Sequence, residues 1–328
     1  MAISLVGALM EPQAGAMRDA LAHIALATGR ACYEDGNEGM GRMGLPERVM
    51  NLADLDAIEA ASTRHETPCG DGRMIWHSWG EGRNNLAPVV LVHGGSGNWA
   101  HWARNIRELV DAGRKVWACD LPGCGESDRP PVGEDGDALP PWIEAGVSAL
   151  GLTRFDLIGF SFGAMVSGFY AARYPDRVRK LVLAGAPALS DRPGPKIALK
   201  EWLRLPDGPQ REEAFRHNLR LLMLAQDASI DDFSLALYVR CLKQDRLTKR
   251  RIARTDILLR TMPDIRAPVY ATWGAQDVLA RGRFDVLEAG LRRAPDFREL
   301  KLIAGAGHWL QFEAADAFDA MLREWLAD

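Results

Sequence analysis

Short runs of consecutive apolar residues recur along the chain and alternate with stretches in which apolar residues return every three or four positions. The runs lie at 88–93, 115–120, 155–160, 180–185, 268–273 and 298–303, and they are typical of strands buried on both faces of a sheet. The helical stretches lie at 98–110, 142–151, 164–173 and 315–326. This alternation predicts an α/β fold with a mostly parallel, doubly wound sheet.

Two further extended segments precede this alternation. They lie at 64–68 and 73–79 and flank the pair Asp71-Gly72, which is typical of a tight hairpin turn. We therefore predict that an antiparallel hairpin opens the sheet.

The alternation stops between Pro187 and Pro268. Helical patterns at 196–205, 211–224, 231–242 and 249–259 fill this interval, and no strand pattern is found in it. We predict a helical cap at 188–264, inserted after the sixth strand between two parts of an α/β core at 62–187 and 265–328. Its apolar face needs burial against the open edge of the sheet, and it consists of Phe215, Leu219, Leu222 and Met223.

Residues 1–61 are expected to form an N-terminal helical extension, whose role the sequence does not define. We predict helices at 16–28 and 47–61, joined by a glycine-rich linker at 36–44, with Leu52, Leu55 and Ile58 on one helix face. The apolar start has no basic region, so it fits a secretory signal poorly. The pattern leaves open whether the first segment is a lid, an oligomerisation arm or the product of an upstream start.

Composition narrows the class of protein. The 328 residues include 47% hydrophobic and 26% charged residues, with a net charge of -4, as in a soluble globular protein without nucleic-acid or anionic-membrane partners. No apolar run reaches the roughly 18 residues of a membrane-spanning helix. The 5 cysteines include no Cys-x-x-Cys pair, which favours free thiols in a reducing compartment such as the cytoplasm. A homodimer stays open.

The strongest chemical signal is Gly159-x-Ser161-x-Gly163, which lies between a predicted strand and a predicted helix. A strand that turns directly into a helix places its turn residue under backbone strain and exposes its side chain. The two glycines remove side chains that would clash. Ser161 is therefore the candidate nucleophile.

A serine hydroxyl needs a base, and the base needs an acid that orients it. Asp277 and His308 follow the last two predicted strands, in the chain order that such a sheet requires. His101 is a rival base, but its helix start with aromatic neighbours favours a packing or substrate-contact role. His93 is expected to hold the loop that precedes the candidate oxyanion site.

Acyl transfer builds negative charge on a carbonyl oxygen, which two backbone N–H groups usually stabilise. We assign them to Phe162, which follows the nucleophile, and to Gly95 in the loop after the third strand. The Ser96 hydroxyl is a candidate helper. A phosphate loop is the alternative for residues 94–97, but no Gly-Lys-Ser/Thr follows them.

From about residue 62 to its end the chain resembles an α/β-hydrolase. The motifs that carry the resemblance occur in the family's order: His93-Gly-Gly-Ser-Gly97, Asp120-Leu-Pro-Gly-Cys-Gly-Glu-Ser127, Gly159-Phe-Ser-Phe-Gly163, Gly274-Ala-Gln-Asp277 and Gly307-His-Trp309. The resemblance implies that Ser161 is the nucleophile, His308 the base and Asp277 its orienter. The pair His308-Trp309 and the phrase at 222–230 are similar to meta-cleavage-product hydrolases, which cut carbon–carbon bonds. Those enzymes tend to have Asn before the nucleophile, where this chain has Phe160.

The substrate pocket is expected to be apolar and aromatic. Candidate residues flank the catalytic loops or lie in the cap, and they are Ser96, Trp99, Trp102, Phe160, Trp309, Met223, Tyr238 and Arg240. Some of the aromatic residues are equally typical of an ordinary core. Arg246 and the run 249–251 are interpreted mostly as a solvated face, from which one cation could reach an anionic substrate.

We therefore expect a serine hydrolase, without metal or cofactor, that acts on a small and mainly apolar ester or acyl compound. The first alternative is carbon–carbon bond cleavage of the meta-cleavage-product type. The second is an acyltransferase, or a ligand-binding member with slow turnover.

Overall fold

The computed structural model describes residues 49–327, apart from residues 84, 134, 193 and 248. Contacts divide the chain into residues 1–41 and residues 42–328, and all described residues belong to the second unit. The helix predicted at 16–28 and the linker predicted at 36–44 lie outside the described residues.

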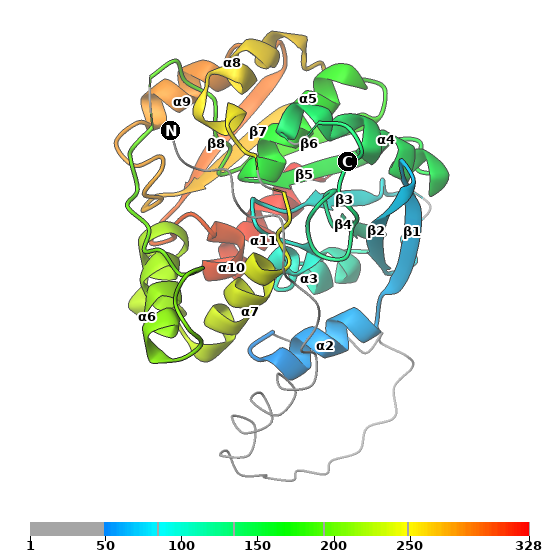
Figure 1. The fold of residues 1–328 in the computed structure, drawn as a ribbon. Helices are drawn as coiled ribbons and strands as arrows, with labels where there is room; N and C mark the ends of the chain where they lie inside the picture. The colour runs from blue at the N-terminus through cyan, green and yellow to red at the C-terminus, as the bar shows by residue number, and fades with distance from the viewer. Residues whose placement is uncertain (1–48, 84, 134, 193, 248, 328) are drawn as a thin grey trace. The chain divides into compact units, whose positions relative to one another are not determined.

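Eight strands form one sheet in the order β1-β2-β4-β3-β5-β6-β7-β8 (Figure 1). Strand β2 pairs antiparallel with β1 and with β4, and the other neighbours are parallel. The bounds are β1 Thr63–Cys69, β2 Gly72–Trp79, β3 Val89–Val92, β4 Val116–Cys119, β5 Phe155–Phe160, β6 Val178–Ala184, β7 Val269–Gly274 and β8 Phe297–Ile303. The predicted hairpin and the predicted doubly wound α/β sheet are both confirmed.

Helices cover both faces of this sheet (Figure 1). One face carries α4 Pro140–Ala149, α5 Phe162–Arg173, α8 Ile257–Thr261 and α9 Phe284–Leu291. The other carries α2 Leu52–Ala60, the 3₁₀ turn η1 Trp99–Trp102, α3 Ile106–Asp111, α10 Leu310–Glu313 and α11 Ala315–Trp325. Shorter 3₁₀ turns are η2 Gly136–Ala138, η4 Asp227–Ser229, η5 Ile252–Arg254 and η6 Met262–Asp264.

Strand β3 shows why the sequences of the central strands are unbroken runs of apolar residues. Val89 and Leu91 belong to the core on one face of the sheet, and Val90 and Val92 belong to the core on the other. All four are fully buried because successive side chains of a strand point to opposite faces. Burial of each side chain contributes roughly 1.5–3 kcal/mol. The rigid strand ends that result are where the candidate catalytic loops begin.

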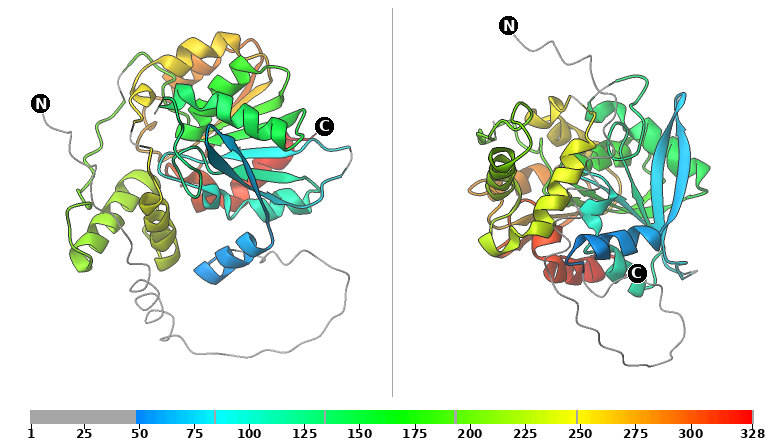
Figure 2. Two further views of the ribbon diagram at one scale, coloured as in Figure 1. Left: turned by 45° about the vertical axis from the view of Figure 1, so that its right-hand side comes forward. Right: turned by 60° about the horizontal axis from the view of Figure 1, so that its bottom comes forward.

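Residues 188–264, which we call the insert, lie between β6 and β7 and contain no strand among their described residues. They include α6 Pro209–Asn218, the π-helical turn η3 Leu219–Met223 and α7 Asp232–Lys243. Figure 2 shows α6 and α7 as a pair beside the core. Phe215, Leu219 and Met223 are buried, and the partly buried Leu222 packs against the same core, as the apolar pattern predicted.

Two helices predicted in the insert are wrong. Residues 196–205 form no helix, because the Asn218 side chain takes both backbone groups of Lys200, at 2.7 Å and 2.9 Å. A helix would need those groups for its own hydrogen bonds. The helix predicted at 249–259 is reduced to η5 and the start of α8, and Asp135 accepts the backbone N–H groups of Arg251 and Ile252 at the beginning of η5.

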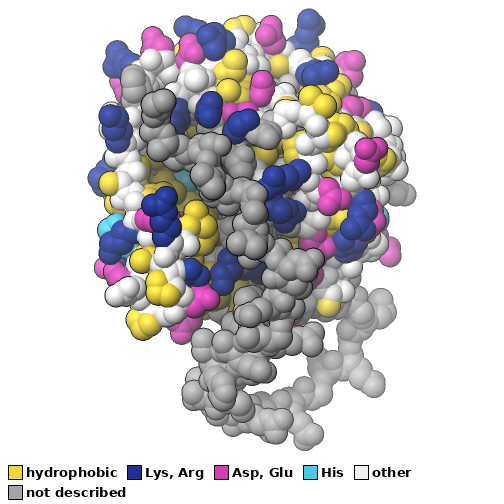
Figure 3. Space-filling view, in the orientation of Figure 1, with side chains coloured by type: hydrophobic (Ala, Val, Ile, Leu, Met, Phe, Trp, Pro, Cys, Tyr) yellow, Lys and Arg dark blue, Asp and Glu magenta, His cyan; other side chains and the backbone are white. Residues whose placement is uncertain are grey.

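The surface of the described residues fits the small net charge. On the described part of the face in Figure 3, Lys and Arg side chains are interspersed with Asp and Glu. Within residues 49–327 as described, no helix has the length and apolar character that a membrane span requires. Cys69, Cys119, Cys124 and Cys241 are buried free thiols.

Candidate active site

Ser161 occupies the sharp turn between β5 and α5. Its backbone has φ 51° and ψ -118°, a strained conformation for a residue with a side chain. The turn is held by the Ser161 N–H, which donates to the Ala184 carbonyl at 2.7 Å. A Cβ atom on Gly163 would lie 2.2 Å from the His93 carbonyl oxygen, so only glycine fits there. The sequence thus builds the predicted turn, and Ser161 is left partly exposed.

Ser161, His308 and Asp277 form a continuous hydrogen-bonded chain. Ser161 Oγ lies 2.8 Å from His308 Nε2, and His308 Nδ1 lies 2.7 Å from Asp277 Oδ2. Asp277 is fully buried and its other oxygen accepts the Leu279 N–H at 2.8 Å. The carboxylate is therefore fixed on both oxygens and the imidazole is held between two partners. These are the three residues that the sequence selected.

The His308 loop is fastened to the insert. Glu313, at the end of α10, accepts the N–H of Gly307 at 2.6 Å, and it also accepts the N–H groups of Ala225 at 2.9 Å and Gln226 at 2.7 Å. The Trp309 N–H donates to the Met223 carbonyl at 2.8 Å. Sequence reasoning missed Glu313, and a carboxylate five residues after the candidate base was the available signal.

Gly307 is required by the same contact. A Cβ atom at this position would lie 2.8 Å from the Ala225 nitrogen and 2.9 Å from the Met223 oxygen. The absence of a side chain lets the insert approach the backbone beside His308 closely. The insert and the His308 loop are thus packed backbone to backbone.

Gly95 and Phe162, whose N–H groups were predicted to bind the oxyanion, lie next to each other in the structure. A Cβ atom on Gly95 would lie 3.6 Å from the Phe162 Cβ, so the two residues are neighbours. Neither N–H has a hydrogen-bond partner among the described residues. Two neighbouring residues therefore have unpaired backbone donors, and one of them directly follows Ser161 in the chain.

His93 and His101 hold this loop as neutral side chains. His93 Nδ1 donates to the Gly94 carbonyl at 2.7 Å, and its Nε2 accepts the Leu121 N–H at 2.9 Å. Burial lowers the pKa of His93 to about 4 and lowers the pKa of His101 well below its usual value. His101 packs between Phe160 and Trp309, with ring centroids 5.6 Å and 5.0 Å away. Both geometries agree with the structural roles predicted for these residues.

Asp120 joins the loops that follow β3 and β4. It is buried and accepts the N–H groups of Trp99 and Glu126, each at 2.9 Å. Burial raises the pKa of Asp120 to about 6. Its motif therefore fastens the loop that carries Gly95 and supplies no group to Ser161.

Arg250 lies beside Gly95 and the Phe162 ring and not in the solvated face that the sequence suggested. Its Nε lies 3.3 Å from the position of a Cβ atom on Gly95, and its Cζ lies 5.4 Å from the centre of the Phe162 ring. Asp245 holds it at 2.6 Å and also accepts the Ser96 hydroxyl at 2.6 Å. The Ser96 hydroxyl therefore binds the insert. The sequence alone did not indicate which of the three basic residues at 249–251 would pack against the core loops.

The other predicted pocket residues fall into separate parts of the structure. Trp99 packs on His77 and Trp79, and Trp102 packs near Phe318 of α11. Phe160 contacts the His308 ring, with centroids 5.1 Å apart. Trp309 stacks on Phe312, and Tyr238 is buried in α7.

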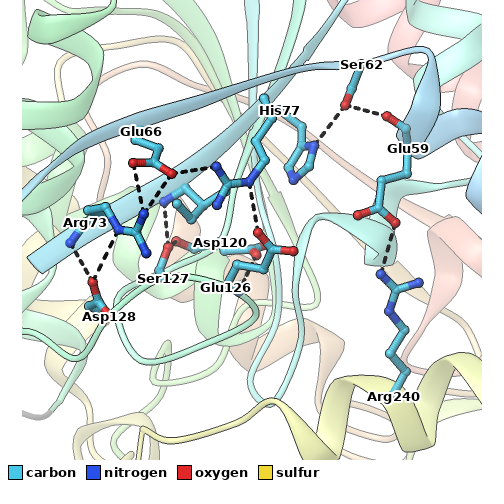
Figure 4. Close-up of polar contacts among 12 residues, drawn as sticks. Glu59, Ser62, Glu66, Arg73, His77, Asp120, Glu126, Ser127, Asp128 and Arg240 are labelled. Atoms are coloured by element: carbon cyan, nitrogen blue, oxygen red, sulfur yellow. Dashed lines mark hydrogen bonds and ion pairs between the residues drawn. The ribbon is translucent and has the colours of Figure 1, made fainter. Parts of the chain in front are cut away.

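Arg240 of α7 points to α2 (Figure 4). Its guanidinium donates to Glu59 at 3.0 Å, and the backbone of Glu59 accepts the Ser62 hydroxyl, which also contacts His77. Both members of this ion pair are about one-third exposed, with values of 31% and 30%. Arg240 therefore joins α7 to α2, and its charge is already matched by Glu59.

A cavity of about 470 Å³ lies between the insert and the loops after β7 and β8. Its lining includes Met223 and Leu224 from the insert, Gln276 from the loop after β7, and His308. Polar residues also line it, namely His217 of α6, Arg220 of η3, Gln226 just before η4, and Arg281 in the loop after β7. No Trp, Phe or Tyr of the described part of the chain lines this cavity, and Trp99 and Trp102 pack in the core, so the aromatic substrate pocket stays a prediction. Among the described residues no group of three or more His, Cys, Asp or Glu side chains could hold a metal ion.

Comparisons with known proteins agree with this architecture. Residues 87–315 match the family model described as alpha/beta hydrolase fold. The 2-hydroxy-6-oxononadienedioate/2-hydroxy-6-oxononatrienedioate hydrolase of Escherichia coli K12 is 30% identical over 276 residues, which cover 78% of this chain and 91% of the relative.

Solved structures share the fold at lower identity. A carboxylesterase from Bacillus subtilis aligns with a TM-score of 0.65 and 16% identity, over 81% of this chain and 92% of its own. A serine hydrolase from Cycloclasticus zankles aligns with a TM-score of 0.65 and 19% identity, over 80% of this chain and 97% of its own.

Proposed function

The chain belongs to the α/β-hydrolase fold family, and from that premise we propose that it is a serine hydrolase that cleaves a small ester or acyl substrate through an acyl-enzyme. The observation that carries the proposal is the hydrogen-bonded chain from Ser161 through His308 to Asp277, beside two unpaired backbone donors. These groups together support a candidate for each role in acyl transfer.

In this mechanism His308 Nε2 takes the proton from Ser161 Oγ as the oxygen attacks the substrate carbonyl. Asp277 keeps the proton of the imidazole on Nδ1 and stabilises the imidazolium that forms. The N–H groups of Gly95 and Phe162 bind the oxyanion of the tetrahedral intermediate. His308 then protonates the leaving group. Water, activated by the same imidazole, releases the acid and regenerates Ser161.

We propose that the insert acts as a cap over this site. The hydrogen bonds of Glu313 and Trp309 join it to the His308 loop, and Asp245 joins it to the loop of Gly95. A cap held at both loops would limit the size of the substrate and reduce the access of water. The cavity of about 470 Å³ is of the size that small molecules occupy.

Carbon–carbon bond hydrolysis is the second candidate, and the 30% identical Escherichia coli relative favours it. In such a reaction the attacked carbonyl is a ketone, and the leaving group is a carbon atom that must be protonated as the bond breaks. One feature of this chain weighs toward esters, because Phe160 stands before the nucleophile where a polar side chain would assist. Arg240, the cation predicted to hold such an acid, is paired with Glu59. The cytoplasmic location and the homodimer stay predictions.

Paired kinetics test the proposal. The enzyme is assayed with p-nitrophenyl esters from acetate upward and with a meta-cleavage product, and Ser161→Ala is the inactive control. We expect the best ester to have the higher kcat/KM. A kcat/KM for the ring-fission acid at least about a hundredfold above the best ester would replace ester cleavage by the second candidate. Absence of turnover on both substrates would contradict the hydrolase proposal itself.

A further inference from the structure

Arg250 has an unsatisfied donor in a buried place. Its Nη2 donates to Asp245 at 2.6 Å, whereas its Nε is buried and has no hydrogen-bond partner among the described residues. A guanidinium carries five N–H donors and stays charged at all physiological pH values. An unpaired donor of a charged group is costly when it is buried. The Cys124 thiol also interacts with the guanidinium but is a weak acceptor. A substrate would therefore supply a strong second acceptor at the part of the Arg250 side chain that stays exposed.

The position of Arg250 indicates which part of a substrate its side chain would contact. Its Nε and Cδ lie 3.3 Å and 3.4 Å from the position of a Cβ atom on Gly95, and its Cζ lies 5.4 Å from the ring centre of Phe162. These are the two residues whose N–H groups bind the oxyanion in the proposed mechanism. The cation therefore lies next to the acyl part of the substrate.

Asp245 fixes the guanidinium and leaves it unable to turn away. One carboxylate oxygen of Asp245 accepts Arg250 Nη2 and the Leu247 N–H, and the other accepts the Ser96 hydroxyl. The Asp245 side chain is 12% exposed and that of Arg250 is 25% exposed. The carboxylate is thus saturated by its partners, and the cation keeps an edge that solvent and substrate can reach.

We propose that Arg250 is a specificity-determining residue that binds an anionic group on the acyl side of the substrate, so that the enzyme prefers acyl compounds bearing a carboxylate close to the scissile carbonyl. This inference rests on the proposed function, because it places the acyl group at Ser161. Half-esters of short dicarboxylic acids are the simplest members of this class. An uncharged acyl chain would offer the guanidinium no acceptor at all, so the cation favours the anionic class.

The test compares monophenyl glutarate with phenyl pentanoate. These esters have the same leaving group and the same chain length, and they differ in whether the chain ends in a carboxylate or a methyl group. Phenol release gives kcat/KM for each, and the ratio of the two values measures preference for the anion. In the wild type we expect the glutarate to have the higher kcat/KM.

Arg250→Met is expected to lower this ratio by roughly ten- to a hundredfold, the range for one charge-assisted hydrogen bond. Arg251→Met is the matched control, because the neighbouring Arg251 is exposed, and its ratio is expected to stay within about twofold of the wild type. Arg250→Met leaves Asp245 unpaired, so the double variant Arg250→Met/Asp245→Asn keeps the test valid if the single variant folds poorly.

Two results would overturn the inference. One is that both Arg250 variants keep the wild-type kcat/KM on both esters, and the other is an equal loss on the two esters, which leaves the ratio unchanged and would assign Arg250 to the fold or to the oxyanion itself. Failure of the proposed function has a different signature. In that case the wild type would hydrolyse neither ester above the rate of Ser161→Ala, whatever residue stands at position 250.

Discussion

Replacement of Glu313 by alanine is expected to damage catalysis without touching any group of the proposed triad. The Glu313 carboxylate accepts the N–H groups of Ala225 at 2.9 Å, Gln226 at 2.7 Å and Gly307 at 2.6 Å. These bonds hold the residue next to His308 against the insert. Because His308 contacts its two partners at 2.7 Å and 2.8 Å, a small displacement of its loop changes the geometry of proton transfer.

The structure sets the size of both effects. Each of the three bonds contributes about 0.5–1.5 kcal/mol, so Glu313→Ala should lower the free energy of unfolding by about 2–4 kcal/mol. A displacement of about 1 Å at a reacting group costs about a hundredfold in rate. Since the Trp309 N–H still donates to the Met223 carbonyl, we expect a smaller movement and a fall in kcat of roughly ten- to a hundredfold.

Three measurements distinguish an effect on the position of His308 from an effect on the stability of the protein. These are urea unfolding, kcat and KM on a p-nitrophenyl ester, and the rate constant for inactivation by a serine-reactive fluorophosphonate, which reports the reactivity of Ser161. Glu313→Gln keeps one acceptor oxygen and should lie between alanine and the wild type. Glu324→Ala is the matched control, because Glu324 makes an exposed ion pair with Lys301.

We expect kcat and the inactivation rate to fall together in Glu313→Ala under conditions where the protein is fully folded, with KM nearly unchanged. The reasoning fails if stability drops as calculated while both rates stay within about twofold of the wild type. Glu313 would then only fasten the insert.

Four further predictions follow from the same geometry. Ser161→Ala should fold normally and lose turnover by at least about 10⁴-fold, and a variant that keeps half its activity would exclude Ser161 as the nucleophile. Asp277→Asn should lower kcat by about 10³- to 10⁴-fold, because the imidazole loses the acceptor for its Nδ1 proton; near-normal activity, with Asp191→Asn or Asp285→Asn inactive, would place the acid elsewhere. Because the proposed chemistry uses only Ser161, His308 and Asp277, activity should survive dialysis against EDTA, and loss reversed by zinc would contradict this. Burial raises the pKa of Asp319 from 3.8 to about 7, so the folded state keeps a proton that the unfolded state loses and stability falls as pH rises between these values. Urea unfolding of Asp319→Asn should therefore show a stability gain over the wild type that grows by up to about 4 kcal/mol from pH 4 to pH 7, whereas a constant difference would refute the shifted pKa.

The sequence by itself determined the strands, their alternation with helices and the three residues at their ends. A strand buried on both faces must be apolar throughout, so β3, β4 and β5 were visible as unbroken runs. The turn at Ser161 was visible because its strained backbone excludes side chains at Gly159 and Gly163. Both signals are local, since the physical constraint acts within a few residues of the chain.

Only the tertiary structure decided which side chains surround Ser161. Trp99 and Trp102 are aromatic residues of the kind that often line a pocket, but they pack in the core. Arg240 is paired with Glu59, which lies far from it in the sequence. Residues 196–205 have a helical pattern, yet the side chain of Asn218 takes the backbone groups that a helix would need.

The roles of Glu313 and Arg250 come from contacts between segments that are distant along the chain. Glu313 joins α10 to the insert 87 and 88 residues away, and Arg250 comes within contact distance of Gly95. In a linear pattern both are single charged residues among many, because a charge acquires its function from the partners that folding places around it.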